Sequence, residues 1–296
     1  MSNLDLQELE KIKKLAIIAM FSDDDLMDTL VLKGGNALDI IYKVADRASV
    51  DLDFSIKSKF DESDLSVVGR KIEAALVKTF REEGYVVFDV YFIKKPKVSK
   101  TEMEDFWGGY KVEFKLIDRE QFQNHSNNLE YLRKHAEVVG NYQKKKFYIE
   151  ISKYEYCDPK SAIDFDGYTI YVYTPIMIAF EKLRAICQQM SEYSLVVNNP
   201  GRSARARDFF DIYTIIEKYN LNLEKSANKN LLKNIFQAKK VPLNLIGKIS
   251  KYREYHRPDF QSVVDTVKPN VKLKKFDYYF DYVVKKFSKL ETLWIK

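Results

Sequence analysis

Two carboxylates stand two positions apart at Asp51 and Asp53, and apolar residues alternate with them. The alternation predicts a strand on which these two side chains share one face. Carboxylates about 7 Å apart on one face repel each other unless a cation lies between them. The spacing therefore predicts a divalent metal site at Asp51 and Asp53.

A pair of glycines, Gly34 and Gly35, ends the short apolar run that precedes this acidic strand. Glycine lets the backbone approach a phosphate closely, and free amides at the start of the following helix would bind that phosphate. A tight turn explains the glycine pair equally well, and a solvated strand face is the alternative for the two aspartates. We interpret the stretch 31–56 as the platform of an active site.

Acidic side chains on later predicted strands are candidates to join this platform. Glu150 stands between two isoleucines in the predicted strand 147–153, where a carboxylate needs an explanation. Glu113 lies in the predicted strand 109–117 and competes with it. We prefer Glu150 and keep Glu113 as the alternative.

Charged residues also gather on two predicted helices that follow the strands. Lys182 belongs to the predicted helix 176–190, where a surface lysine is the simpler interpretation. The predicted helix 204–219 begins with a group of four charged residues, namely Arg205, Arg207, Asp208 and Asp211. Arg207 and Asp211 are spaced to form an i,i+4 ion pair, which is the alternative to a functional role.

Periodicity in the remaining sequence predicts the elements that position these residues. We expect further helices over 4–21, 60–83 and 118–139, strands over 29–33, 85–93 and 168–173, and a loop over 191–203. Trp107 lies in a basic loop, where packing is favoured over contact with nucleic acid. After Pro175 the pattern becomes helical, so we expect an α/β domain over 1–165 and a helical domain over 166–296.

Composition sets broad limits on function. The 296 residues include 49 Lys and Arg against 43 Asp and Glu, and the net charge of +6 mildly favours an anionic partner. Cys157, Cys187 and three scattered histidines indicate neither a zinc site nor a disulfide framework. No signal peptide is recognisable and no apolar run approaches the roughly 20 residues that span a bilayer, so we expect a cytoplasmic protein without a membrane partner.

The glycine pair, a spacer helix, a strand Asp-x-Asp and a later strand acid together resemble the core of polymerase-beta-like nucleotidyltransferases. Closer still, the motifs resemble the AbiEii family of nucleotidyltransferases, through Leu-Lys-Gly-Gly-Asn-Ala-Leu and Arg47-x-Ser49-x-Asp51-Leu-Asp53-Phe. Pro175, Glu181-Lys182-Leu-x-Ala185 and Arg205-Ala-Arg207-Asp208-x-x-Asp211 resemble its later motifs. The resemblance implies an α/β nucleotidyltransferase core with a mixed sheet, followed by a C-terminal helical bundle.

The resemblance also suggests a role for each candidate. Asp51, Asp53 and Glu150 would hold Mg²⁺ or Mn²⁺, and Glu150 would deprotonate or position the acceptor hydroxyl. Lys182 would contact a phosphate, while Asp208 or Asp211 orients Lys182 or the acceptor. The expected catalytic residues are Asp51, Asp53, Glu150, Lys182 and Asp208. The expected nucleotide contacts are Gly34, Gly35, Asn36, Ser49, Lys182, Arg207 and Asp211.

The resemblance implies transfer of a nucleotide from an NTP to a hydroxyl, with a tRNA 3′ end as the expected acceptor. Several members of the family are toxins of type IV toxin–antitoxin or abortive-infection systems, so an antitoxin encoded nearby is an expected partner. Two alternatives remain open at this point. The acceptor could be a protein or small-molecule hydroxyl, or the chain could be a binding protein that holds a nucleotide without catalysis.

Overall fold

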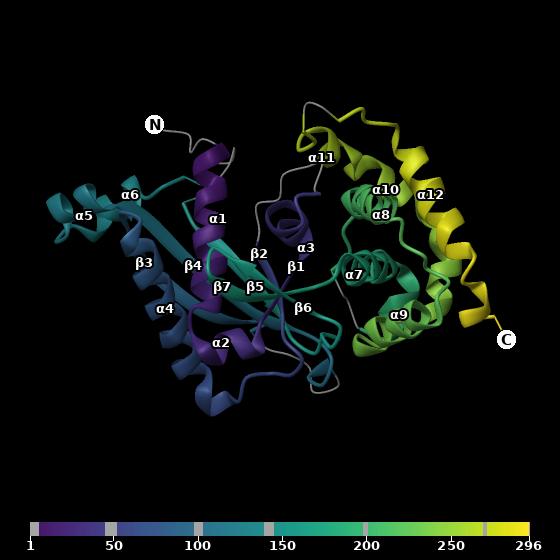
Figure 1. The fold of residues 1–296 in the computed structure, drawn as a ribbon, viewed down its shortest axis with the longest axis horizontal. Coiled ribbons are helices and arrows are strands. Elements are labelled where there is room, and N and C mark those ends of the chain that lie inside the picture. Colours follow the sequence, from purple (N-terminus) through teal and green to yellow (C-terminus); the bar gives the residue numbers. More distant parts are fainter. Residues whose placement is uncertain are drawn as a thin grey trace.

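The computed structural model describes residues 6–44, 52–97, 103–138, 145–197, 201–268 and 271–295. A mixed sheet and the helices that cover it form one side of the molecule, and a group of C-terminal helices forms the other (Figure 1). The sheet has seven strands in the order β3-β4-β5-β2-β1-β7-β6. The predicted fold class, an α/β core followed by helices, is confirmed.

The strands alternate buried and accessible positions where one face is covered, as the sequence predicts. Their bounds are β1 (Val31–Lys33), β2 (Leu52–Ser55), β3 (Tyr85–Lys95), β4 (Gly109–Asp118), β5 (Phe147–Ser152), β6 (Ser161–Phe165) and β7 (Tyr168–Val172). β2 pairs antiparallel with β1 and parallel with β5. The centre of the sheet is therefore built from segments far apart in the chain.

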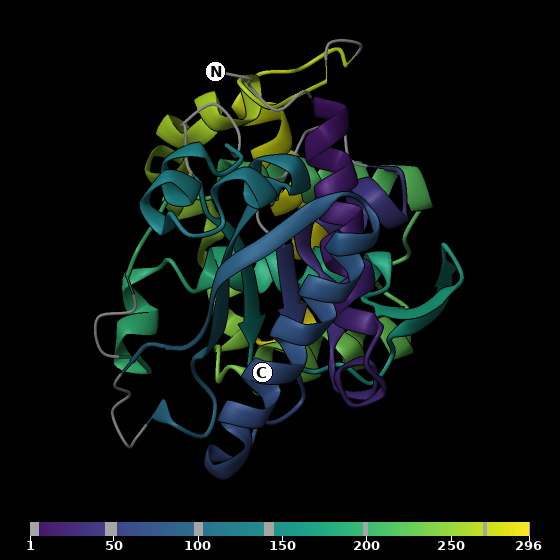
Figure 2. The same cartoon turned by 90° about the vertical axis from the view of Figure 1, so that its left-hand side faces the viewer.

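Helices α1 and α4 lie across one face of the sheet, with the C-terminal helices behind it (Figure 2). Asp23 caps α2 by accepting a hydrogen bond from the Leu26 amide at 3.1 Å. The helices of the N-terminal part are α1 (Leu6–Phe21), α2 (Asp24–Thr29), α3 (Gly34–Asn36) with its π-helical continuation (Ala37–Ile41), α4 (Leu65–Glu82), α5 (Arg119–His125) and α6 (Leu129–His135). A 3-10 turn over Glu62–Asp64 precedes α4.

The C-terminal helices pack on one another through aromatic side chains such as Phe209 and Phe280, whose ring centroids are 5.0 Å apart. These helices are α7 (Pro175–Cys187), α8 (Ala206–Tyr219), α9 (Ser226–Ala238), α10 (Arg253–His256), α11 (Gln261–Val264) and α12 (Phe276–Ser288). Short 3-10 segments join them over Ser191–Leu195, Leu243–Tyr252, Arg257–Phe260 and Glu291–Leu293. Among the described helices, none is both long enough and apolar enough to cross a bilayer.

Several details differ from the sequence-based expectations. The single helix expected over 118–139 is two short helices. The first ends at His125, and Asn128 caps α6 by accepting a hydrogen bond from the Tyr131 amide at 3.0 Å. Ser191–Leu195, expected as part of a loop, forms a 3-10 turn.

Strand β6 was not expected, although its signal is present. Asp166 and Gly167 form a two-residue turn between β6 and β7 with φ of 52° and 82°, the backbone that an Asp-Gly hairpin favours. The expected boundary between 165 and 166 falls inside this hairpin. The sheet therefore extends to Val172. The division into two domains stays a prediction, and we propose its boundary at 173–174.

Both cysteine side chains are buried and carry free thiols. Burial raises the pKa of Cys157 to about 11 and raises the pKa of Cys187 as well. Since the thiolate is the reactive form, we expect neither thiol to react rapidly with Ellman's reagent at pH 8 in the folded protein. Both should react in guanidinium chloride. Rapid labelling of either thiol before unfolding would contradict this packing, and single Cys→Ser variants would identify which.

Candidate active site

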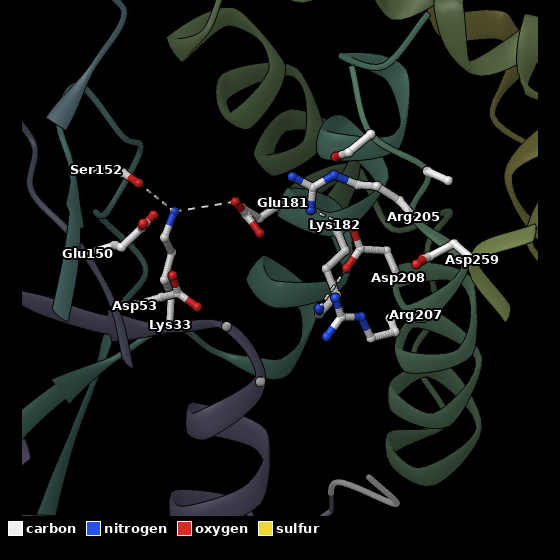
Figure 3. A pocket seen from close by; sticks show the side chains of 14 residues that line it. Lys33, Asp53, Glu150, Ser152, Glu181, Lys182, Arg205, Arg207, Asp208 and Asp259 are labelled. Atoms are coloured by element: carbon white, nitrogen blue, oxygen red, sulfur yellow. Dashed lines mark hydrogen bonds and ion pairs between the residues drawn. The ribbon is translucent and has the colours of Figure 1, made fainter. Parts of the chain in front are cut away.

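Asp53 and Glu150 lie opposite each other on the neighbouring parallel strands β2 and β5. Residues in register on adjacent strands project from the same face, with backbones about 4.8 Å apart. On the other side of β2, the antiparallel pairing with β1 places Lys33 opposite Asp53. Figure 3 shows Lys33, Asp53 and Glu150 grouped on the same side of the site. The structure therefore brings together two acids that the sequence separates widely.

Two of the predicted site residues, Asp51 and Ser49, lie outside the described residues. Within the described part of the chain, no three His, Cys, Asp or Glu side chains are grouped as a metal site. The carboxylate oxygens of Asp53 and Glu150 are the hard donors that Mg²⁺ and Mn²⁺ prefer. The donor chemistry therefore fits the expected metal, and Asp53 and Glu150 are the described residues that would hold it.

Gly34 begins α3 directly beside the carboxylate of Asp53. Its φ of +73° lies in the left-handed region, and a Cβ built there would be 2.6 Å from Asp53 Oδ2. Both the backbone conformation and the lack of space therefore require glycine at this position. Gly34 is therefore a glycine because it lies against the Asp53 carboxylate, and not only because the backbone turns there.

A cavity of about 430 Å³ opens between this part of the sheet and helices α7 and α8. The sheet side and α3 contribute the glycine pair, the two acids, Lys33 and Ser152. The helical side contributes Glu181, Lys182, Ser203, Ala204, Arg205, Arg207, Asp208 and Asp259. Figure 3 shows these two groups of side chains facing each other.

Asn36 is placed differently from the other predicted contacts. Its side chain is fully buried at 0% exposure, and the residue is not among those that line the cavity. Helix formation over Gly34–Ile41 turns Asn36 into the interior, whereas the two glycines before it stay at the cavity wall.

Lys33 connects the sheet to α7. Its ammonium group donates to Ser152 Oγ at 3.1 Å and Glu181 Oε1 at 3.3 Å, and lies 3.5 Å from Glu155 Oε1. Burial alone would lower the pKa of Lys33, but Glu181, Glu155 and then Asp53 outweigh it and the pKa is raised. Lys33 is therefore a fixed positive charge beside the acids. Sequence reasoning gave it no role, although it directly precedes the glycine pair.

Lys182 is buried at 6% exposure, so the interpretation as a surface lysine is wrong. Its ammonium group lies 2.9 Å from Asp208 Oδ1 and 2.7 Å from Asp211 Oδ2. This contact holds α7 against α8 at the edge of the cavity. Asp208 and Asp211 therefore both orient Lys182, and Asp211 lies behind it rather than at the cavity wall.

The pKa of Asp208 reflects this pairing. Burial raises the pKa of Asp208, but the positive charges of Lys182 and Arg205 lower it by more than burial raises it. The pKa therefore lies well below its usual value of 3.8. Arg205 Nη1 is 3.0 Å from Asp208 Oδ2. Arg207 is exposed at the cavity, and no carboxylate of the described residues is ion-paired with it. Arg207 is thus the cation best placed to receive an anionic ligand.

The structure separates the two candidates for the third acid. Glu150 lines the cavity, and its Oε1 accepts a hydrogen bond from Lys95 at 2.6 Å. Glu113 lies on β4, opposite Tyr148 of β5. Its carboxylate oxygens are 2.5 Å from Lys111 Nζ and 2.9 Å from Lys146 Nζ. Glu113 does not line the cavity.

The depressed pKa of Asp208 predicts how stability changes with pH. When the pKa of a carboxyl group is lower in the folded state, the ionised group stabilises the fold. This stabilisation is complete above the unfolded-state pKa near 4, and it is lost as the pH falls toward the folded-state pKa. We expect Asp208→Asn to lower the free energy of unfolding by about 2 kcal/mol at pH 7. The difference from the native protein should shrink between pH 5 and pH 3.

Urea unfolding at several pH values measures this difference. Asp164→Asn is the matched control, since Asp164 is exposed on the edge strand β6 and has no ion pair among the described residues. An Asp208→Asn difference that stays constant from pH 7 to pH 3 would contradict the assigned ion pair.

Two solved structures align along most of the chain, with TM-scores below 0.5. A candidate nucleotidyltransferase from H. pylori is 19% identical, with 99% of this chain and 100% of that chain covered and a TM-score of 0.49. An antigenic nucleotidyltransferase-like protein from Paracoccidioides brasiliensis is 16% identical, with 90% and 96% covered and a TM-score of 0.34.

The search of curated proteins found no match. The family described as "Nucleotidyl transferase AbiEii toxin, Type IV TA system" matches residues 16–282, which include every described strand and all residues of the cavity. The chain belongs to the AbiEii family of nucleotidyltransferase toxins.

Proposed function

We propose that this protein transfers a nucleoside monophosphate from an NTP to the 3′ hydroxyl of an RNA, with tRNA as the acceptor, in a metal-dependent reaction. One observation carries the proposal. Asp53 and Glu150 are adjacent and in register at a cavity whose opposite wall carries Lys182, Arg205 and Arg207. Paired acids facing cations are what a metal-bound triphosphate requires.

The reaction forms a bond between the acceptor oxygen and the α-phosphorus. The bond from that phosphorus to the bridging oxygen breaks, and pyrophosphate leaves. Glu150 receives the acceptor proton or holds the hydroxyl in position. Asp53 and Glu150, with Asp51 from outside the described residues, would hold Mg²⁺ or Mn²⁺, which when bound neutralises charge on the phosphates.

The remaining residues bind and orient the nucleotide. Gly34 lies beside Asp53 and both glycines line the cavity, where their backbone would contact phosphate oxygens. The exposed Arg207 would supply a bidentate cation. Lys182 would contact a phosphate at the cavity edge, where two carboxylates fix its position and compensate its charge. Asn36 and Asp211, which lie behind the cavity wall, support these groups rather than touch the nucleotide.

RNA is the proposed acceptor because the chain carries a net charge of +6 and belongs to a family of type IV toxins. Contacts between cations and phosphates would make RNA binding weaken as salt increases. We infer that the enzyme acts in the cytoplasm and that an antitoxin encoded nearby opposes it. A growth assay with and without the adjacent gene tests the toxin role separately from the chemistry.

Gly34→Ala tests the close approach of the backbone to Asp53. Because the new Cβ would meet the Asp53 carboxylate at 2.6 Å, we expect transfer to fall by about a hundredfold or more. Gly167→Ala is the matched control. Gly167 also has a positive φ, of +82°, but nothing lies within 4 Å of its built Cβ, so this variant should lose stability and keep activity. Equal loss of activity in both variants would contradict the interpretation.

Substitution of the two strand acids tests which one takes part in catalysis. Glu150→Gln should reduce transfer of label from an α-labelled NTP by about a thousandfold, since it removes a base and metal donor. Glu113→Gln should retain activity within a few fold, because Glu113 is bound by lysines away from the cavity. The reverse pattern would assign the third acid to Glu113.

A further inference from the structure

A second cavity, of about 540 Å³, adjoins the first on the β5 side of the acids. The two cavities share Lys33, Glu150, Ser152, Glu181 and Arg205 in their walls. Its volume falls in the range of sites that enclose small organic groups. Glu150 therefore lies where a group in the second cavity would meet a ligand in the first.

The walls of the second cavity differ in character from the charged first cavity. Met103, Trp107, Pro96 and Val197 line it with apolar and aromatic surface, and Gln188 adds an amide that can both donate and accept. Trp107 is half-buried, with its ring centroid 6.2 Å from that of Tyr193. A flat aromatic side chain beside one amide is suited to a planar heterocycle.

Buried ion pairs fix the floor of this cavity. The Arg184 guanidinium binds the carboxylate of Glu155 at 2.6 Å and 3.1 Å, and Arg184 Nη2 also reaches Glu181 at 3.2 Å. Lys239 donates to the Phe106 carbonyl at 3.2 Å, which ties α9 to the segment that carries Trp107. The charges of the floor are thus engaged with one another.

Cations gather at the outer edge of the same cavity. Lys95 lines it and is exposed, and Lys153 donates its amide to the Gly108 carbonyl at 3.1 Å beside it. Burial and then the neighbours Lys94 and Lys59 lower the pKa of Lys153, although Glu62 and Glu104 partly offset them. Lys95, which is also bound to Glu150, and the neighbouring Lys153 are the cations at this edge that suit the phosphates of a chain entering the cavity.

We propose that the second cavity binds the terminal nucleoside of the acceptor RNA, with its base against Trp107 and its hydroxyl directed at Glu150. The inference rests on the proposed function and extends it to the acceptor. Entering and leaving oxygens lie roughly in line at a reacting phosphorus. With pyrophosphate at Gly34, Gly35 and Arg207, the entering hydroxyl lies toward Glu150, where the second cavity opens.

Binding can be tested without turnover. The chain has two tryptophans, so in a Trp294→Phe background Trp107 is the sole tryptophan fluorophore. Without NTP, an oligoribonucleotide ending in a free 3′ hydroxyl should quench its fluorescence saturably. A seryl peptide should leave the fluorescence unchanged. No quenching by RNA, or equal quenching by the peptide, would overturn the inference.

Kinetics test the same site under turnover. Trp107→Ala should raise the KM for the RNA acceptor by about tenfold and leave the KM for NTP within twofold. Trp107→Phe should restore most of the RNA affinity, which excludes misfolding as the cause. Trp294→Ala is the matched control, because Trp294 packs beside Gly247 outside both cavities.

The two proposals fail in different ways. An unchanged KM for RNA in Trp107→Ala would overturn the second-cavity assignment and leave nucleotidyl transfer intact. Absence of transfer by the native protein with any acceptor would overturn the proposed function, and the quenching experiment would still decide whether RNA occupies the cavity.

Discussion

The placement of β2 between β1 and β5 puts Lys33, Asp53 and Glu150 in one row across three strands. Two carboxylates next to each other in such a row are stable as anions only where positive charge compensates them. Lys33 supplies part of this charge from within the sheet, and Lys95 supplies part from its edge. Gly34 carries no side chain because its φ of +73° and the neighbouring Asp53 carboxylate in this row leave no room for one.

Buried ion pairs connect this row of charged residues on the sheet to helices α7 and α8. Lys33 reaches Glu181 on α7, Lys182 joins α7 to α8 through two aspartates, and Arg184 joins α7 to Glu155. Breaking a buried pair leaves an uncompensated charge, which costs more than forming the pair contributes. These contacts therefore fix how the helical wall of the cavity faces the two acids, so the cavity between them has a defined width.

Alternating apolar residues are sufficient to predict the strand that carries Asp53 and the strand that carries Glu150. Register is not available from one sequence, because it arises when distant strands pair. The sequence therefore favours Glu150 but cannot exclude Glu113 until β4, β5 and β2 are assembled. The buried partners of Lys182 depend in the same way on how α7 packs against α8. The Asp166-Gly167 hairpin, in contrast, carried a local signal that predicts it.

The distribution of a radioactive label between products tests the central claim most directly. Native protein and Asp53→Asn would be incubated with total RNA, Mg²⁺ and NTP labelled in turn at the α- or γ-phosphate. The account predicts that the α-label enters RNA, that the γ-label appears only in pyrophosphate, and that Asp53→Asn transfers neither. Entry of the γ-label into RNA, or transfer by Asp53→Asn at the native rate, would contradict it.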